Sequence, residues 1–310
     1  VVLFPQLIAG PIVRYHDIAG QIVHRLYSSE GFLRGLWRFA FGLAKKVLIA
    51  NTVGRAADRA FAAGSLGADD AWLGALCYTV QIYFDFSGYS DMAIGLARML
   101  GFSLLENFRA PYMAASFTEF WRRWHISLSN WMREYLYIPL GGNRCGRGRQ
   151  YLNLWIVFFL SGLWHGAAWN FIVWGLYHGF FLSLDKLGAP LRRRVPRLLA
   201  VPATFVLVMI GWVLFRAETL GAAWAYLRCM AGLGGGAQAA VPALSPQQLT
   251  ALIVGLTVGF LPWAAPWWET AEWTVQEDRP GAVWRLTART VLTGLLLLGA
   301  LMALVTTGFN

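Results

Sequence analysis

A long stretch from Gln150 to Leu184 contains no Asp, Glu, Lys or Arg. Basic loops flank it at Pro139–Arg149 and Lys186–Arg197. Such loops favour the cytoplasmic side of a membrane, so the chain between them should cross the bilayer an even number of times. Two full spans need about 40 residues, and this stretch is shorter. The sequence therefore predicts two short or tilted helices that break near residues 162–166.

His165 lies at the predicted break. An ionisable side chain deep in an apolar segment is costly to leave unpaired, which makes it a candidate functional residue. The alternative is a packing residue whose ring is hydrogen-bonded to a neighbouring carbonyl. Trp164 adjoins this histidine, and Asn170 and His178 follow, which favours the functional interpretation.

The composition indicates a membrane protein. Hydrophobic residues make up 57% of the chain and charged residues 14%, whereas soluble domains carry about 25% charged residues. The net charge is +10, but the basic residues fall between apolar stretches, which argues against a nucleic-acid-binding face. The three cysteines have no metal-binding spacing, and no metal site is predicted. We expect an all-α, polytopic integral membrane protein, with residues 1–310 forming one domain truncated at both ends.

Two segments carry charge within apolar surroundings. Ala71–Leu100 contains Asp85 and Asp91, which a helix would place four residues from Tyr89 and Ser87 respectively, so each pair could be satisfied locally. These side chains either join helices or form the wall of a hydrated cavity. Phe32–Ala50 has basic residues at helical spacing, typical of an amphipathic helix at the inner leaflet, or of a span end with snorkelling cations.

The segment Ser116–Tyr137 predicts one amphipathic helix. Ser116 and Glu119 have capping-box spacing. Aromatic and apolar residues, Trp121 among them, recur at steps of three and four, and a neighbouring row holds Thr118, Arg122, His125 and Ser129. This polar row either faces lipid headgroups or lines the mouth of a cavity for an anionic ligand.

The remaining elements have weaker sequence signals. Val1–Val13 is too short to span and reads as the end of a span or a re-entrant turn. Further expected elements are spans at Leu198–Phe215, Leu249–Trp263 and Val291–Val305, a short amphipathic piece at Ala222–Met230, a loop at Gly232–Pro246 and an acidic stretch at Glu269–Asp278. The chain shows no internal repeat, which argues mildly against a transporter built from inverted halves.

Five motifs together resemble the membrane-bound O-acyltransferase family, in its bacterial branch that acetylates polysaccharides such as alginate. They are Phe4–Tyr15, Tyr83–Asp91, Glu119–Ser129, Tyr135–Arg144 and Gly162–Gly166, and they follow the order of the family across most of the chain. The resemblance implies a bundle of tilted and broken helices around a central channel, with further N-terminal spans that this chain lacks. It also implies a multi-pass protein of the bacterial inner membrane.

In that family, His165 matches the catalytic histidine and His125 a second histidine of this branch. The implied reaction moves an acetyl group from a cytoplasmic donor, expected to be acetyl-CoA, across the membrane, with no bound cofactor and with periplasmic polysaccharide-acetylation proteins as partners. A neutral His165 would act as general base. The candidate channel-lining or substrate-binding residues are Asp85, Ser87, Tyr89, Asp91, Trp121, Arg122, Ser129, Trp164, Asn170 and His178.

Three alternatives stay open. The first is D-alanyl transfer to teichoic acids, for which the acyl group would come from a carrier protein. The second is a proton-coupled transporter, in which Asp85, Asp91 and His165 would form an ion path. The third is a non-catalytic scaffold in a secretion complex.

Overall fold

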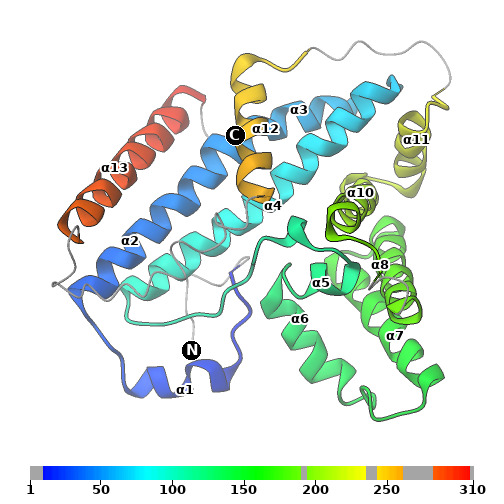
Figure 1. The fold of residues 1–310 in the computed structure, drawn as a ribbon, viewed down its shortest axis with the longest axis horizontal. Coiled ribbons are helices and arrows are strands. Elements are labelled where there is room, and N and C mark those ends of the chain that lie inside the picture. Colours follow the sequence, from blue (N-terminus) through cyan, green and yellow to red (C-terminus); the bar gives the residue numbers. More distant parts are fainter. Residues whose placement is uncertain (1–9, 190–193, 235–242, 261–281, 308–310) are drawn as a thin grey trace.

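The computed structural model describes residues 10–189, 194–234, 243–260 and 282–307, and these ranges are helical without a strand. Figure 1 shows two groups of helices. One is a set of long helices formed by α2 (Ser29–Ala44), α3 (Asn51–Ala62) and α4 (Ala68–Met99), flanked by α12 (Pro246–Phe260) and α13 (Ala282–Thr307). The other contains α7 (Arg147–His165), α8 (Trp169–Leu187) and α10 (Arg197–Arg216).

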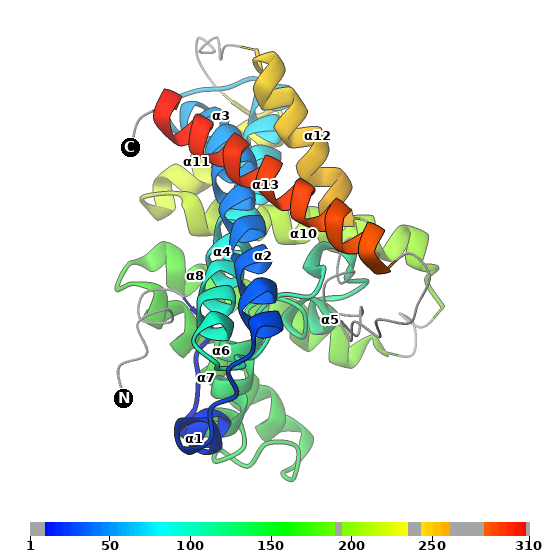
Figure 2. The same ribbon diagram turned by 90° about the vertical axis from the view of Figure 1, so that its left-hand side faces the viewer.

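The long helices pack closely because glycines face each other. A π-helical turn, η2 (Lys45–Ala50), joins α2 to α3, and α4 runs back alongside them (Figures 1 and 2). A Cβ added at Gly42 would lie 2.5 Å from the carbonyl oxygen of Gly88, and one added at Gly35 would lie 2.5 Å from that of Gly95. Small residues thus let the two backbones touch at two levels, as in packed membrane helices.

We expect Gly88→Val to destabilise the protein by about 1–3 kcal/mol, because the side chain must push α2 away from α4. The measurement is the thermal unfolding midpoint of the purified protein in detergent. Gly148→Val is the control, since a Cβ there meets nothing within 4 Å. Equal midpoints for the two variants would contradict the close contact.

The basic segment predicted at the inner leaflet instead packs into the helical core. Arg38 is only 8% exposed, and its Nη2 lies 2.9 Å from Oδ1 of Asp91 on α4. Lys45 Nζ lies 2.5 Å from Oδ2 of the same carboxylate, and Glu106 also pairs with Arg38. The prediction of a headgroup-facing helix is wrong here, because these cations face a buried carboxylate.

The local pairs predicted within α4 are also wrong. Asp91 bonds to α2 and η2 rather than to Ser87, whose buried Oγ has no hydrogen-bond partner among the described residues. Asp85 pairs with Lys46, Nζ to Oδ1 at 2.5 Å, rather than with Tyr89. A carboxylate gains more from a cation than from a neutral hydroxyl.

The predicted break near residues 162–166 is confirmed. α7 ends at His165, α8 begins at Trp169, and the two pack as a hairpin with basic residues at both open ends. A Cβ at Gly162 would collide with the carbonyl oxygen of Phe171, so this glycine permits the close turn. The span predicted at Leu198–Phe215 corresponds to α10, the one helix in the described ranges that is long and apolar enough to cross a bilayer.

The segment predicted as one helix over 116–137 is divided in three. It forms α5 (Phe117–Trp121), α6 (Ile126–Met132) and a π-helical turn, η4 (Arg133–Tyr137). The N-cap is confirmed, because Ser116 Oγ accepts a hydrogen bond from Glu119 N at 3.1 Å. Smaller elements are α1 (Tyr15–Val23), η3 (Pro111–Met113) and α11 (Leu220–Met230). The acidic stretch at 269–278, most of Val1–Val13, part of the 232–246 loop and the end of the 249–263 span lie outside the described residues.

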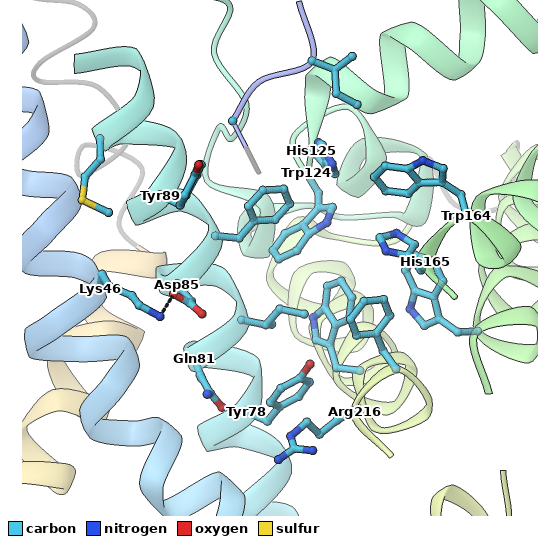
Figure 3. A pocket seen from close by; sticks show the side chains of 18 of the residues that line it. Lys46, Tyr78, Gln81, Asp85, Tyr89, Trp124, His125, Trp164, His165 and Arg216 are labelled. Carbon is cyan, nitrogen blue, oxygen red and sulfur yellow. Dashed lines mark ion pairs between the residues drawn. The ribbon is translucent and has the colours of Figure 1, made fainter. Parts of the chain in front are cut away.

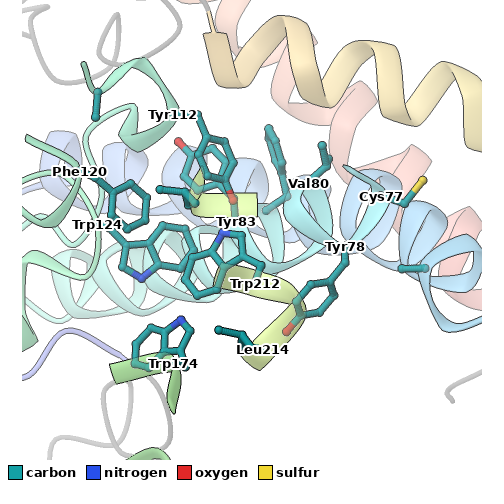
Figure 4. Packing of buried hydrophobic residues seen from close by; sticks show 14 of the residues in the cluster. Cys77, Tyr78, Val80, Tyr83, Tyr112, Phe120, Trp124, Trp174, Trp212 and Leu214 are labelled. Atoms are coloured by element: carbon teal, nitrogen blue, oxygen red, sulfur yellow. The ribbon is translucent and has the colours of Figure 1, made fainter. Parts of the chain in front are cut away.

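An aromatic core joins the two groups of helices (Figure 4). The Trp212 ring lies 4.8 Å from that of Trp124 and 6.1 Å from that of Trp174, between centroids. Tyr83 of α4 packs 5.2 Å from Tyr112. These contacts hold α4, α8 and α10 around the turn that follows α5, and this turn carries His125.

Candidate functional site

A cavity of about 990 Å³ lies between the two groups of helices. His165 and His125 both line it, although 40 residues separate them in sequence. Figure 3 shows the two histidines on one side and the Lys46–Asp85 pair across from them. This volume is in the range of cavities that enclose small-molecule ligands.

One face of α4 forms the wall opposite the histidines. Tyr78, Gln81, Asp85, Tyr89 and Met92 line the cavity at steps of three and four, as expected for one helical face. The wall is polar at intervals, and its carboxylate is neutralised by Lys46. Asp85 and Tyr89 were predicted to line a channel, and both lie at the cavity.

His165 sits at the C-terminal end of α7, in an aromatic enclosure. Its ring centroid lies 5.1 Å from those of Trp174 and Phe215 and 5.0 Å from that of Trp164, all three edge to face. No other described residue forms a hydrogen bond with its ring nitrogens. The imidazole is therefore held by packing, and its nitrogens are available to a bound molecule. Trp164 also lines the cavity and is 58% exposed.

His125 reaches the cavity because the helix is interrupted between α5 and α6. It adopts a left-handed conformation, φ 44° and ψ 54°, as the N-cap of α6. This break separates His125, which is buried, from Arg122, which is exposed, so the predicted polar row does not exist. A period of 3.6 residues assumes a continuous helix, and one left-handed residue changes the direction of every side chain after it.

The other predicted residues lie away from the cavity lining. Trp121 donates from Nε1 to Nδ1 of the fully buried His178 at 3.2 Å, so the two form a packing pair. Asn170 donates to the carbonyl of Ala217 at 2.8 Å and ties α8 to the end of α10. Ser129 Oγ lies 3.5 Å from the Trp124 carbonyl. Asp91 faces Arg38 and Lys45, Ser87 is buried, and neither residue lines the cavity.

Several lining residues were missed by the sequence analysis. Arg216 Nη2 lies 2.7 Å from Asp58 Oδ1, and both residues line the cavity together with Lys46. A signal existed for Arg216, since it ends the apolar span at Leu198–Phe215 and marks a charged end. Asp58 and Lys46 carry no such signal, because their partners lie on distant segments.

Sequence comparison shows the family to which this chain belongs. The sequence profile of the membrane-bound O-acyltransferase family matches residues 1–216, which contain both histidines. The chain belongs to that family. A membrane location follows from this membership, and the expected family resemblance is confirmed.

Three relatives of the family match between 46% and 76% of this chain. A probable alginate O-acetylase of Pseudomonas aeruginosa is 52% identical over 235 residues, covering 76% of this chain and 45% of that protein. A peptidoglycan O-acetyltransferase of Helicobacter pylori is 45% identical over 243 residues, with 76% and 46% coverage. A teichoic acid D-alanyltransferase of Bacillus subtilis is 30% identical over 156 residues, with 46% and 40% coverage. The chain spans about half the length of these relatives.

Proposed function

We propose that this protein is an O-acyltransferase that acetylates an exported polysaccharide such as alginate, with acetyl-CoA as the cytoplasmic donor. The observation that carries the proposal is the cavity with His165 and His125 on one wall. The relatives named for O-acetylation support acetyl over D-alanyl transfer, because they match at higher identity over more of the chain.

The cavity residues suit transfer from a thioester to a hydroxyl. His165 takes the proton of the acceptor hydroxyl, whose oxygen attacks the thioester carbonyl carbon. The C–O bond forms, the C–S bond breaks, and the proton passes from His165 to the leaving thiolate. Trp164, Trp174 and Phe215 surround the imidazole and keep water from competing with the acceptor.

We further propose several passes through the bacterial inner membrane, with the basic ends of α7 and α8 in the cytoplasm. Arg147 begins α7, and Lys186 lies in the last turn of α8. The 19 residues of α7 cover about 28 Å, so His165 lies far from the cytoplasmic end. This depth suits delivery of the acyl group toward periplasmic acetylation partners.

The geometry favours an enzyme over the proton-coupled transporter. A proton path through Asp85, Asp91 and His165 needs the three to face a common space, but Asp91 is buried against Arg38 and Lys45. The scaffold hypothesis gives no reason for two histidines to line one cavity.

Deleting the protein in its host is expected to remove the O-acetyl groups of the exported polysaccharide while the amount of polymer is retained. The measurement is acetate released by mild alkali per mass of polymer, with the reintroduced full-length protein as control. Membranes given labelled acetyl-CoA should transfer label to the polymer or to a periplasmic partner. Transfer from a D-alanyl carrier protein alone would contradict the donor assignment, and loss of the polymer itself would indicate a scaffold.

A further inference from the structure

Asn107 is buried, 1% exposed, in the segment between α4 and α5. Its carbonyl accepts a hydrogen bond from Ile126 N at 3.0 Å, and Arg109 N donates to the Arg123 carbonyl at 2.9 Å. These two main-chain bonds fix residues 107–109 against residues 123–126, the turn that carries His125. The position of Asn107 relative to this histidine is thus set by the backbone as well as by side chains.

The orientation of the Asn107 amide follows from its neighbours. Ser127 N lies 3.3 Å from Oδ1, and a backbone N–H only donates, so the atom that faces it is the amide oxygen. Ser127 Oγ lies 2.8 Å from the same oxygen, and Nδ2 donates to Ser90 Oγ at 3.0 Å. The alternative flip would set two donors, the amide NH₂ and the backbone N–H, against each other.

The same oxygen determines where the proton of His125 lies. Nδ1 of His125 is 3.1 Å from Asn107 Oδ1. Since the amide oxygen only accepts, Nδ1 carries the hydrogen, and in the neutral ring Nε2 then bears the lone pair. His125 lines the cavity, and Nε2 is the ring nitrogen that Asn107 leaves for a molecule bound there.

We propose that Asn107 is a positioning residue that holds His125 in the Nδ1–H tautomer and so presents Nε2 to the substrate as a hydrogen-bond acceptor. This inference rests on the proposed function, in which the substrate occupies the cavity that His125 lines. Neutral His125 in this tautomer accepts from a hydroxyl or amide N–H of the substrate and does not donate to a developing oxyanion. The Phe86 ring packs edge to face at 4.7 Å between centroids and restricts rotation of the imidazole.

The tautomer is measured directly by ¹⁵N NMR of the full-length protein in lipid, labelled at histidine. The chain has five histidines, so the His125 signal is assigned by its loss in His125→Ala. We expect a protonated Nδ1 and a bare Nε2 in the wild type, and a changed tautomer ratio in Asn107→Ala. A wild-type His125 protonated at Nε2, or a tautomer ratio unchanged in Asn107→Ala, would overturn the proposal.

The second measurement is acetyl transfer at equal protein level. Asn107→Ala is expected to lower kcat by about 10–100-fold with little change in the KM for the donor, as for loss of an orienting partner. Ser127→Ala, which removes a hydroxyl from the same amide oxygen without touching His125, should stay within about threefold of wild type. Equal loss in both variants would mean that Asn107 acts only by packing. If His125→Ala transfers acetyl at the wild-type rate, His125 has no role in the transfer reaction. The NMR measurement would still test the tautomer of His125 independently of that result.

Discussion

Replacing His165 with alanine is expected to lower acetyl transfer by about 10²–10⁴-fold, the usual contribution of a general base. The variant should accumulate in the membrane at the wild-type level, because His165 makes no hydrogen bond with another described residue and is held by ring contacts alone. His165→Gln should be equally inactive, since a glutamine amide has no basic nitrogen. The readout is O-acetyl content of the exported polysaccharide, with the protein level checked by blot.

His178→Phe is the matched control for a buried histidine. His178 lies in the same aromatic core, but its Nδ1 accepts from Trp121 and it does not line the cavity. The change leaves a buried Trp N–H unpaired and should reduce stability by about 1–3 kcal/mol, while transfer per folded molecule is retained.

Each outcome of the His165 experiment has a distinct meaning. Normal acetylation by His165→Ala would make this residue a packing histidine, and the assignment of the base would move to His125. Loss of polymer rather than of its acetyl groups would indicate an export or scaffolding role.

Replacing Asp91 with alanine is expected to destabilise the protein by about 3–5 kcal/mol, because it removes one partner of a buried ion cluster. The Asp91 carboxylate faces both Arg38, at 2.9 Å, and Lys45, at 2.5 Å, and all three side chains are largely buried. Without it, Glu106 is the one carboxylate left to pair with Arg38 among the residues that the structure describes. The measurement is the unfolding free energy or thermal midpoint in detergent.

Asp85→Ala is the matched control on the same helix. Asp85 also pairs with a lysine of η2, but both side chains are about two-fifths exposed, 42% for Asp85 and 40% for Lys46. Exposed pairs contribute roughly 0–1 kcal/mol. Similar losses of stability in the two variants would show that burial does not distinguish these carboxylates.

Much of the candidate site was predictable from local pattern. His165, His125, Asp85, Tyr89 and Trp164 were singled out from the sequence and the family motifs, and all line the cavity. The predicted residues that lie elsewhere, such as Trp121 and His178, satisfy one another in the core. Asn107 was missed because an isolated asparagine in an irregular segment has no periodic signal.

The sequence by itself determined the helical class, the break at His165, the N-cap at Ser116 and the apolar helix α10. These depend on hydrophobic period, glycine and capping residues within a few positions of one another. Only the tertiary structure decided that Asp91 faces Arg38, 53 residues away, and that His125 adopts a left-handed conformation beside Asn107. The physical reason is that a charge or a polar ring in an apolar interior takes whichever partner the packing of distant helices brings within reach, and sequence spacing does not encode that approach.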